Sequence, residues 1–578
     1  DRVKTVRGRL AVDGSEIRPF HHEDAVRAAR FFRDAGITTI GVCFLHSYAD
    51  PAHELAMREV LTAEHPEAVV SISSEVLREY REYERAITTL VDAAVKPDIT
   101  SYVANIARRL ADFATAESAD GRAAESTRDV PFYVMKSNGG VLSAAEVVHQ
   151  PISTVLSGPA AGALGAAVIA SAAGVGKVLT CDGGGTSTDV TVVIDGRPAL
   201  TTEGTVGAYP SKIPMIDVVT VGAGGGSIAW LSPEGTLKVG PQSAGADPGP
   251  VCYGKGGVQP TITDAHVLLG RIPPHLLGGE IPLDADAARQ TVESLAAKLG
   301  RPVEECATGI LEISAWNQAN ALRQVSVKRG LDVRDFTLVA FGGSGSLLAC
   351  RLVDILGLAG VLVPPNPGNV SAFGLLTVDV RNDYVRTHVV RQHRLDLDRL
   401  SAVLAELQVD ADSALQREGF PAEERRFVRT ADVRYYGQAF EVRVEVGDEA
   451  LGRDVAERVA QAFHAEHRRL YGYDFADDPR QQVEWVNVRV TGIGPIRSPD
   501  VVPVGSGSGA DSARTGTRRA YFEDWANVPT YNRSQLGCGD VIEGPAVIEE
   551  FGSTVPLHPG FRAEVDRYGN LRITRNAA

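Results

Sequence analysis

The stretch from Val178 to Val193, VLTCDGGGTSTDVTVV, places the strongest constraint on how this chain can fold. An apolar run leads to Asp182, three glycines follow, and a second run of alternating character begins at Asp189. This order predicts a strand, a glycine turn and a second strand. Consecutive glycines let several backbone N–H groups point into one concavity, which is typical of a site for a phosphate or another anion.

The residues around the turn exclude two common phosphate motifs. No Gly-Lys-Ser/Thr follows, as a Walker A loop requires, and the next element is a strand, whereas a Rossmann turn leads into a helix. Asp182 and Asp189 flank the turn and fit a Mg²⁺–nucleotide site, where carboxylates hold the metal or its waters beside the phosphates. The alternative is a glycine-rich hairpin in which Asp182 caps its own turn.

Length and charge narrow the class of protein. A chain of 578 residues is too long for one hydrophobic core, so two to four domains are expected. The net charge of −15 argues against nucleic acid or an anionic membrane as the main partner. No apolar run has the length of a membrane span and no secretory leader precedes Arg2. Six scattered cysteines without a CxxC pair predict reduced thiols in a cytoplasmic protein.

Two further glycine loops follow apolar strands. VVTVGAGGG ends at Gly226, and FTLVAFGGSGS opens onto residues 342–346, where the small residues suit the flat base or ribose of a nucleotide. The irregular segment 240–264 is rich in glycine and proline and is expected to shape a pocket. PFYVMKSNGG predicts a strand that ends at Ser137 and Asn138, where a ligand could be met.

Periodicity predicts the main helices and the later domains. Helical spacing is found over 22–34, 285–299, 303–328, 401–417 and 454–471, and over 74–112 with an interruption at Pro97. From residue 382 onward the glycine loops stop, and helices alternate with strand patterns. Residues 504–518 have the composition of a flexible linker, and the last sixty residues look like a small β-rich unit.

Taken together, the motifs resemble the A-type chains of the hydantoinase/oxoprolinase family. Its members include N-methylhydantoinases, 5-oxoprolinases, lactamases and the nucleotide-binding subunits of acetone and acetophenone carboxylases. The resemblance is carried, in order, by SGPAAG, DGGGTSTDV, VGAGGGSIAW, VGPQSAGADPGPVCYGKGG, PTITDAHVLLGR, FGGSGS and VPPNPGNVSAFGLL. With HSYADPAHE, REYERAITT and GPAVIEEFGSTVPLHPG it covers nearly the whole chain.

The resemblance implies an α/β fold with actin-like ATPase lobes, of the sugar kinase and heat-shock chaperone type, plus a C-terminal α+β domain with a β-rich end. Residues 1–85 would be the remainder of an N-terminal lobe, and 86–385 a core with the second phosphate loop and the adenosine loop. Residues 386–503 would be the α+β domain, 504–518 a linker and 519–578 the β-rich unit. Apart from DGGGT at 182–186, which the resemblance assigns to the second phosphate loop, the sequence has no Asp-x-Gly-Gly-Thr that could be the first phosphate loop, which lies near the N-terminus in the family. We therefore expect the native chain to have residues before Asp1.

The candidate site residues follow from the glycine turns and strand ends above, and the resemblance adds the roles of second phosphate loop and adenosine loop. Asp182 and Asp189 would be catalytic and would hold Mg²⁺ with ATP. The residues expected to contact the nucleotide are Gly183, Gly184, Gly185, Thr186, Ser187, Thr188, Gly224, Gly225, Gly226, Gly342, Gly343, Ser344 and Gly345. The residues expected in a substrate pocket are Ser137, Asn138, Ser243, Asp247 and Asp264.

The implied activity is ATP-dependent hydrolysis of a cyclic amide, such as a hydantoin, 5-oxoproline or a lactam. Phosphoryl transfer to the amide oxygen would make that oxygen leave readily. A B-type subunit would supply the later, metal-dependent step, so a hetero-oligomer is expected. The alternatives are an ATP-binding subunit of a ketone carboxylase and, outside enzymes, an ATP-driven conformational module like a chaperone.

Overall fold

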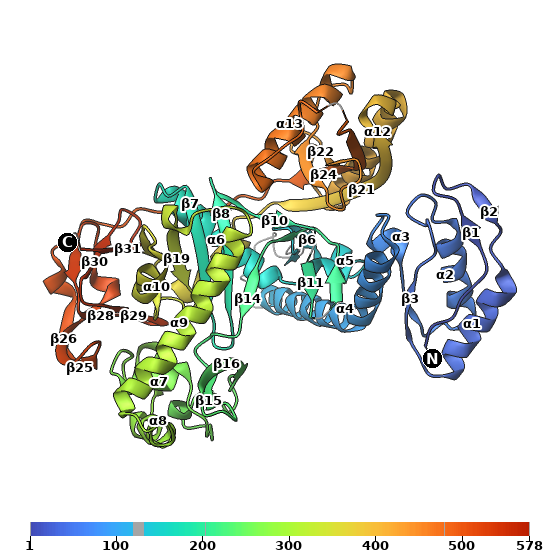
Figure 1. The fold of residues 1–578 in the computed structure, drawn as a ribbon. Coiled ribbons are helices and arrows are strands. Elements are labelled where there is room, and N and C mark those ends of the chain that lie inside the picture. The colour runs from blue at the N-terminus through green and yellow to red at the C-terminus, as the bar shows by residue number, and fades with distance from the viewer. Residues whose placement is uncertain (1, 120–131, 203, 208, 479, 577–578) are drawn as a thin grey trace. The chain divides into compact units, whose positions relative to one another are not determined.

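The protein folds into two compact units. The computed structural model describes residues 2–119, 132–202, 204–207, 209–478 and 480–576. Unit 1 comprises Asp1–Ser157, Leu200–Met215 and Val378–Ile496. Unit 2 comprises Gly158–Ala199, Ile216–Thr377 and Arg497–Ala578 (Figure 1). This division differs from the one expected from sequence, because residues 86–385 contribute to both units.

The N-terminal part of unit 1 is a small α/β layer. Its elements are β1 (Arg9–Leu10), β2 (Glu16–Arg18), α1 (His22–Asp34), β3 (Thr39–Val42), α2 (Ala52–Glu64), β4 (Val69–Ile72), α3 (Ser73–Val76) and α4 (Glu82–Ala119). Strands β3 and β4 are parallel, and α1 and α2 pack against them through Phe32 and Leu61. Helix α1 has the predicted bounds because His21 caps it and Gly36, with a φ of 66°, follows its end.

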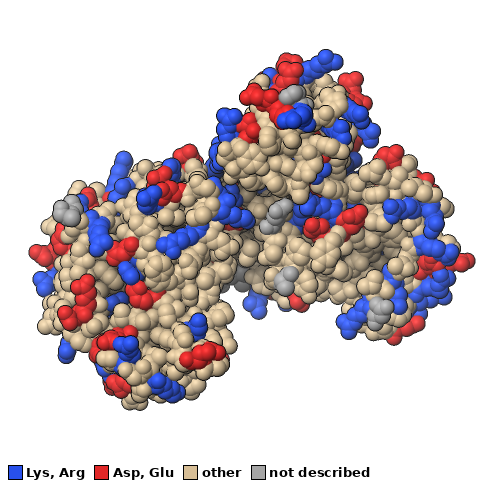
Figure 2. Space-filling view, in the orientation of Figure 1, with Lys and Arg blue, Asp and Glu red and all other residues tan. Residues whose placement is uncertain are grey.

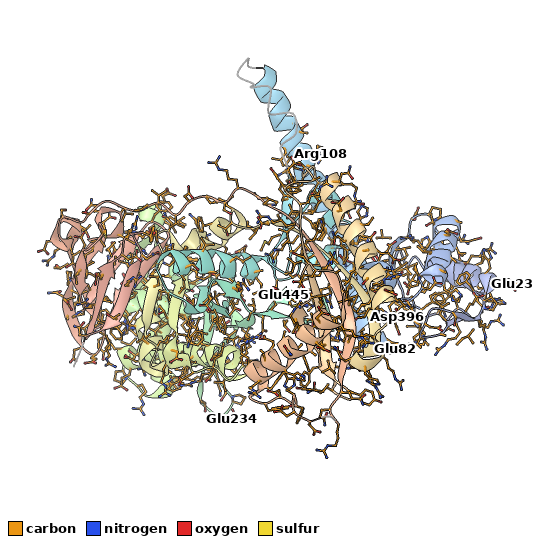
Figure 3. All side chains as sticks on the ribbon, turned by 90° about the horizontal axis from the view of Figure 1, so that it is seen from above. Glu23, Glu82, Arg108, Glu234, Asp396 and Glu445 are labelled. Carbon is orange, nitrogen blue, oxygen red and sulfur yellow. The ribbon has the colours of Figure 1, made fainter. Side chains whose placement is uncertain are left out.

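Helix α4 continues through Pro97, where an interruption was predicted. Buried polar contacts fix the turn that precedes the proline: Asp92 accepts hydrogen bonds from the Ser71 hydroxyl at 2.7 Å and from the Ile152 N–H at 3.1 Å. Such tertiary contacts outweigh the loss of one helical donor at proline. Figure 3 shows α4 projecting from the rest of unit 1 beyond Arg108.

A six-stranded sheet forms the second part of unit 1. The strand order is β23-β22-β24-β21-β6-β5. The elements are β5 (Tyr133–Met135), β6 (Val141–Ser143), α5 (Ala144–Val147), β21 (Val380–Arg391), α12 (Leu397–Arg417), β22 (Arg426–Tyr435), β23 (Val442–Glu445), α13 (Arg453–Tyr471) and β24 (Val483–Gly494). Helices α12 and α13, both near the predicted ranges, pack on this sheet around Leu404, Phe463 and Trp485. The segment from 200 to 216 adds four short strands: β10 (Leu200–Thr201), β11 (Gly204–Val206), β12 (Tyr209–Ser211) and β13 (Met215–Ile216).

Unit 2 is built on a nine-stranded mixed sheet in the order β14-β8-β7-β19-β20-β31-β30-β27, with β9 paired to β8. Its strands are β7 (Lys177–Gly183), β8 (Thr188–Ile194), β9 (Arg197–Pro198), β14 (Val219–Val221), β19 (Thr337–Phe341), β20 (Gly360–Val363), β27 (Val541–Glu543), β30 (Phe561–Val565) and β31 (Leu571–Arg575). Strands β7, β19 and β20 are parallel, while β7 and β8 form the antiparallel hairpin that the sequence predicts.

Helices cover both faces of this sheet. They are α6 (Ser157–Ala172), α9 (Val303–Val327), α10 (Ala349–Leu356) and α11 (Val370–Leu375). Side chains alternate along β7, so Leu179 and Cys181 pack with α9 and α10, whereas Val178 packs with α6 and α11. The α6 face therefore also receives the side chain of Asp182, which has the same parity as Val178.

A helical insert lies between β14 and β19. It contains β15 (Ser227–Leu231), β16 (Leu237–Ser243), α7 (Ile262–Leu268), β17 (His275–Leu276), β18 (Ile281–Pro282) and α8 (Ala285–Leu299). Helices α7, α8 and α9 share one core with the β15–β16 hairpin. Glu234, labelled in Figure 3, marks the turn of that hairpin.

The C-terminal segment is part of unit 2, and the prediction of a flexible linker at 504–518 is wrong. The strands are β25 (Arg514–Tyr521), β26 (Trp525–Asn532), β28 (Ala546–Glu550) and β29 (Ser553–Leu557). Strand β25 pairs with β26, and Ser506 bridges to Cys538, so backbone pairing orders residues whose composition is typical of a linker. The predicted separate unit at 519–578 instead adds β27, β30 and β31 to the nine-stranded sheet and shares its core.

The surface of each unit is mixed in charge. Figure 2 shows acidic and basic side chains interspersed over the visible face, and neither sign forms one continuous area there. Within the described residues, no helix combines the length and the apolar character that crossing a bilayer requires.

Candidate functional site

Three glycine loops meet at the end of the β7–β8 hairpin in unit 2. The Ser344 N–H donates to the carbonyl oxygen of Gly183 at 2.8 Å, and the Ser344 hydroxyl donates to that of Gly184, also at 2.8 Å. From the other side, the Gly225 N–H donates to the same Gly184 oxygen at 3.0 Å. The loops at 183–188, 224–226 and 342–345, each singled out in the sequence, therefore form one structure.

Direct contact between two of these backbones explains why glycine is needed. A Cβ atom at Gly183 would lie 2.4 Å from the nitrogen of Gly345. A Cβ at Gly345 would lie 1.9 Å from the carbonyl oxygen of Phe341. Both distances are far shorter than a non-bonded contact, so a side chain at Gly183 would force the two loops apart, and one at Gly345 would distort the turn after β19.

The tip of the hairpin offers donors to a ligand. Gly185 and Thr186 are exposed, and no backbone N–H bond of either residue is formed within the described part of the chain. The neighbouring Gly184 N–H, in contrast, closes the turn by donating to the Ser187 carbonyl at 2.9 Å. Two adjacent free N–H groups in a glycine turn make a nest for an anionic oxygen.

Two carboxylates lie close to the turn of the same hairpin. Asp182 on β7 lies directly opposite Asp189 on β8 in the strand register. The Ser371 hydroxyl donates to Asp182 Oδ2 at 3.2 Å, and the Thr220 hydroxyl donates to Asp189. Directly opposed residues bring like charges close together, which is unfavourable unless a cation lies near them.

The pKa values of both carboxyls record this environment. The pKa of Asp182 is raised to about 6, mainly by burial; the Ser371 hydrogen bond opposes this shift and the charge of Asp189 adds to it. Burial also raises the pKa of Asp189, against the effect of its Thr220 hydrogen bond. A divalent cation would stabilise both ionised forms, and Mg²⁺ commonly takes one or two carboxylates with phosphate and water oxygens. The pair therefore fits such an ion.

A cavity of about 870 Å³ opens beside the loops. Its size is within the range of small-molecule sites. The residues that line it include Gly184, Gly185, Gly225, Gly226, Gly343, Ser344, Gly245, Tyr253, Lys255, Thr263, His275, Asn366, Arg533, Glu550 and Phe551. Neither Asp182 nor Asp189 lines it. The glycine loops thus border the cavity, while the carboxylates lie on the two strands just before the turn and outside the cavity lining.

The side chain of Thr188, a residue expected to contact the nucleotide, stabilises the loops from the protein interior. It is completely buried, and its hydroxyl donates to the Ala223 carbonyl at 3.0 Å. Gln318 of α9 donates to the same carbonyl at 3.0 Å. The side chain of Thr188 thus fixes the 224–226 loop and has no exposed surface for a ligand.

Asp264 is also structural, so its prediction as a substrate-pocket residue is wrong. It is completely buried at the start of α7, where it forms a capping box with Thr261. Besides Thr261, it accepts hydrogen bonds from the N–H groups of Val251 at 3.2 Å and Cys252 at 2.8 Å. Asp264 therefore holds the start of the loop that continues to Lys255.

We expect Asp264→Ala to lower the free energy of unfolding by about 3 kcal/mol or more, because it leaves several buried N–H groups unpaired at roughly 1–3 kcal/mol each. Urea denaturation followed by circular dichroism measures it. The matched control is Asp284→Ala, which removes one exposed cap bond to the Ala287 N–H at 2.8 Å and should cost about 1 kcal/mol. Equal losses in the two variants would contradict the role given to Asp264.

The remaining predicted pocket residues separate into two groups. Ser243 lies beside the hairpin, with its hydroxyl 3.5 Å from that of Thr186, and Asp247 is exposed and does not line the cavity. Ser137 and Asn138 belong to unit 1, whereas the glycine loops and the cavity belong to unit 2. The Ser137 hydroxyl is buried and donates to the Ser153 carbonyl at 2.8 Å, so it anchors its own turn.

Several cavity residues were missed by the sequence reasoning. Tyr253 and Lys255 lie in the motif CYGKGG, so a signal was present, but glycine content alone drew attention to this segment. Arg533 and Phe551 come from the region that was predicted to be a separate β-rich unit. The pairing of β20 with β31, and the hydrogen bond from the Ser346 hydroxyl to the Thr554 carbonyl, show that this region belongs beside the glycine loops.

Comparison with known proteins places the chain. The sequence model described as Hydantoinase/oxoprolinase matches residues 85–384, the one for the family's C-terminal domain matches 391–575, and the one for its N-terminal region matches 1–65. The alpha chain of the caprolactamase of Pseudomonas jessenii is 33% identical over 99% of this chain and 81% of its own length. The chain therefore belongs to the hydantoinase/oxoprolinase family, as its motifs predict.

Solved structures agree with this assignment. The crystal structure of ATP-dependent caprolactamase from Pseudomonas jessenii has a TM-score of 0.83 and 32% identity, covering 99% of this chain and 82% of that one. A nucleotide-free structure of acetone carboxylase, described as an ATP-dependent carboxylation system, has a TM-score of 0.80 and 26% identity, covering 99% and 81%. The α/β class and the prediction of an enzyme of this type are confirmed; the actin-like nature of the lobes stays a prediction.

Proposed function

We propose that this chain is the ATP-binding subunit of an enzyme that hydrolyses a cyclic amide. The observation that carries the proposal is the meeting of three glycine loops beside paired carboxylates and a cavity of about 870 Å³. The similarity to the caprolactamase of Pseudomonas jessenii supports the substrate class. The description of its crystal structure as ATP-dependent supports the nucleotide.

In this proposal the chain's own residues bind and orient the triphosphate. The N–H groups of Gly185 and Thr186 receive phosphate oxygens, and the small residues of the 342–345 loop leave room for the nucleoside. Fixed donors of this kind stabilise the charge that develops during phosphoryl transfer without having to reorganise. The bond from the γ-phosphorus to the bridging oxygen of ADP breaks as a bond to the amide oxygen forms.

Asp182 and Asp189, which form the second residue pair before the turn, would hold Mg²⁺. Such an ion neutralises phosphate charge and helps to hold the transferred group in line. Phosphorylation turns the amide oxygen into a good leaving group, so that water can attack the carbon in a later step. A B-type partner chain is proposed to supply that step, consistent with the naming of the caprolactamase relative as the alpha chain of its enzyme.

A second candidate is the ATP-binding subunit of a ketone carboxylase, which the structural similarity to acetone carboxylase favours. There the phosphorylated oxygen would be that of an enolate, and bicarbonate would supply the carbon. Both candidates use the same nucleotide site, so they differ only in the acceptor.

We expect ATP turnover by the purified complex to be stimulated at least about tenfold by one class of acceptor, as positioning a reactant commonly contributes that much. ADP release is measured with 5-oxoproline, a hydantoin, caprolactam, and acetone plus bicarbonate. Stimulation by a cyclic amide supports the first candidate, whereas stimulation only by the ketone with bicarbonate selects the second. If no ATP binding is detected by calorimetry, both candidates fail.

A further inference from the structure

One basic side chain that lines the cavity of unit 2 forms no hydrogen bond or ion pair with the described residues. Four of its described lining residues carry formal charges: Lys255, Arg533, Glu549 and Glu550. Arg533 is buried and donates to the carbonyls of Val363 at 2.6 Å and Gly569 at 3.1 Å. In contrast, Lys255 is exposed and has no hydrogen bond or ion pair within the described residues.

The acidic residues of the cavity are also engaged. Glu550 lies 3.3 Å from Arg533, and its other oxygen accepts the Asn366 N–H at 2.7 Å. Glu549 pairs with Arg518. Because each of these acids already has a basic or N–H partner, none of them is needed to neutralise Lys255.

The backbone conformation around Lys255 positions this residue at the cavity. Gly254 and Gly256, its two neighbours, have φ values of 66° and 94°, which other residues rarely adopt. Three residues upstream, the N–H of Cys252 is fixed by buried Asp264. A loop with one end fixed and a left-handed residue on each side of the lysine has a defined course, and it brings Lys255 to the cavity that the phosphate nest borders.

We propose that Lys255 binds the phosphate chain of the nucleotide from the cavity side. The inference rests on the proposed function, because it takes the ligand of the glycine loops to be a nucleoside triphosphate. The hairpin supplies neutral N–H donors, and the ammonium group of lysine supplies the positive charge that those donors lack. A charged contact of this kind strengthens with each added phosphate and contributes nothing to the nucleoside.

The test compares four ligands on the full chain by calorimetry: ATP, ADP, AMP and adenosine. Lys255→Met removes the charge and keeps a long side chain, Lys255→Arg keeps the charge, and Lys298→Met removes an exposed charge of α8 that does not line the cavity. For Lys255→Met we expect the Kd of ATP to rise about 10- to 100-fold, the range for a charged hydrogen bond. The Kd of adenosine should change less than about twofold, and Lys255→Arg should retain most of the ATP affinity.

The outcomes separate the inference from the proposal beneath it. Wild-type ATP affinity in Lys255→Met, or an equal loss for ATP and adenosine in a variant that unfolds like wild type, would overturn the role of Lys255 alone. An absence of ATP binding by the wild-type chain would overturn the proposed function and the inference with it. Lys298→Met should bind all four ligands as wild type does, and a loss of ATP affinity in this control would mean that general charge accounts for the effect.

Discussion

Asp182→Asn should abolish ATP turnover while leaving the protein folded. The substitution removes one of the two charges that would hold the metal, and loss of a single electrostatic contact of this kind typically costs about a hundredfold or more in rate. The asparagine oxygen can still accept the Ser371 hydroxyl that now bonds Asp182 at 3.2 Å. Turnover is measured as ADP release by the complex. Asp195→Asn, the same change at the exposed far end of β8, is the matched control and should be silent.

The free energy of unfolding of Asp182→Asn, compared with wild type as a function of pH, distinguishes a metal site from a helix- or turn-capping role. Burial raises the pKa of Asp182 to about 6, so its contribution to stability is present below its unfolded pKa and is lost as the pH rises through about 6. At pH 7 without metal, Asp182→Asn should therefore be at least as stable as wild type, with the difference vanishing in acid. Metal–nucleotide affinity of the wild type should fall as the pH drops through about 6, because the carboxyl becomes protonated. A destabilised variant with normal turnover would instead favour the capping role.

Gly345→Ala should disrupt the junction of the glycine loops. The added methyl would lie 1.9 Å from the Phe341 carbonyl and 2.9 Å from that of Cys181, both backbone atoms that cannot rotate away. We expect a loss of at least about 3 kcal/mol in the free energy of unfolding, at the upper end for overpacking, together with loss of ATP binding. Chemical denaturation and calorimetry measure the two effects.

Gly343→Ala provides the control for this experiment. A Cβ at Gly343 meets nothing within 4 Å, so its unfolding free energy should stay within about 0.5 kcal/mol of wild type. If Gly345→Ala were as stable as Gly343→Ala, the close approach of Gly345 to the carbonyls of Phe341 and Cys181 would not exist in solution.

Local patterns predicted the hairpin and the helices well. Asp182 and Asp189 were placed on paired strands because glycines interrupt two apolar runs, and helix α8 has its predicted bounds because Asp284 caps it and Gly300 ends it. These features depend on residues close in sequence. The same reasoning identified all three glycine loops, which the structure brings together.

Long-range pairing accounts for what sequence did not reveal. Residues 514–518 look like a linker, yet they belong to β25 because β26 provides backbone partners. Asp264 resembles a ligand-binding carboxylate until its N–H donors from Val251 and Cys252 are seen. Lys255 was passed over because a lysine in a glycine loop is informative only when the cavity beside it is known. Burial and partners of this kind are not encoded in local periodicity.

The pairing of β20 with β31 has a consequence for how the protein is made. Val361 pairs across the sheet with Ile573, so β20 leaves the ribosome long before its neighbour has been synthesised. Until then the apolar β20 has an open edge, which is a template for pairing with other chains. The sheet that bears the glycine loops can therefore close only late in translation. A chain that stops before Leu571 would carry this open edge permanently, and chaperones and proteases would decide its fate.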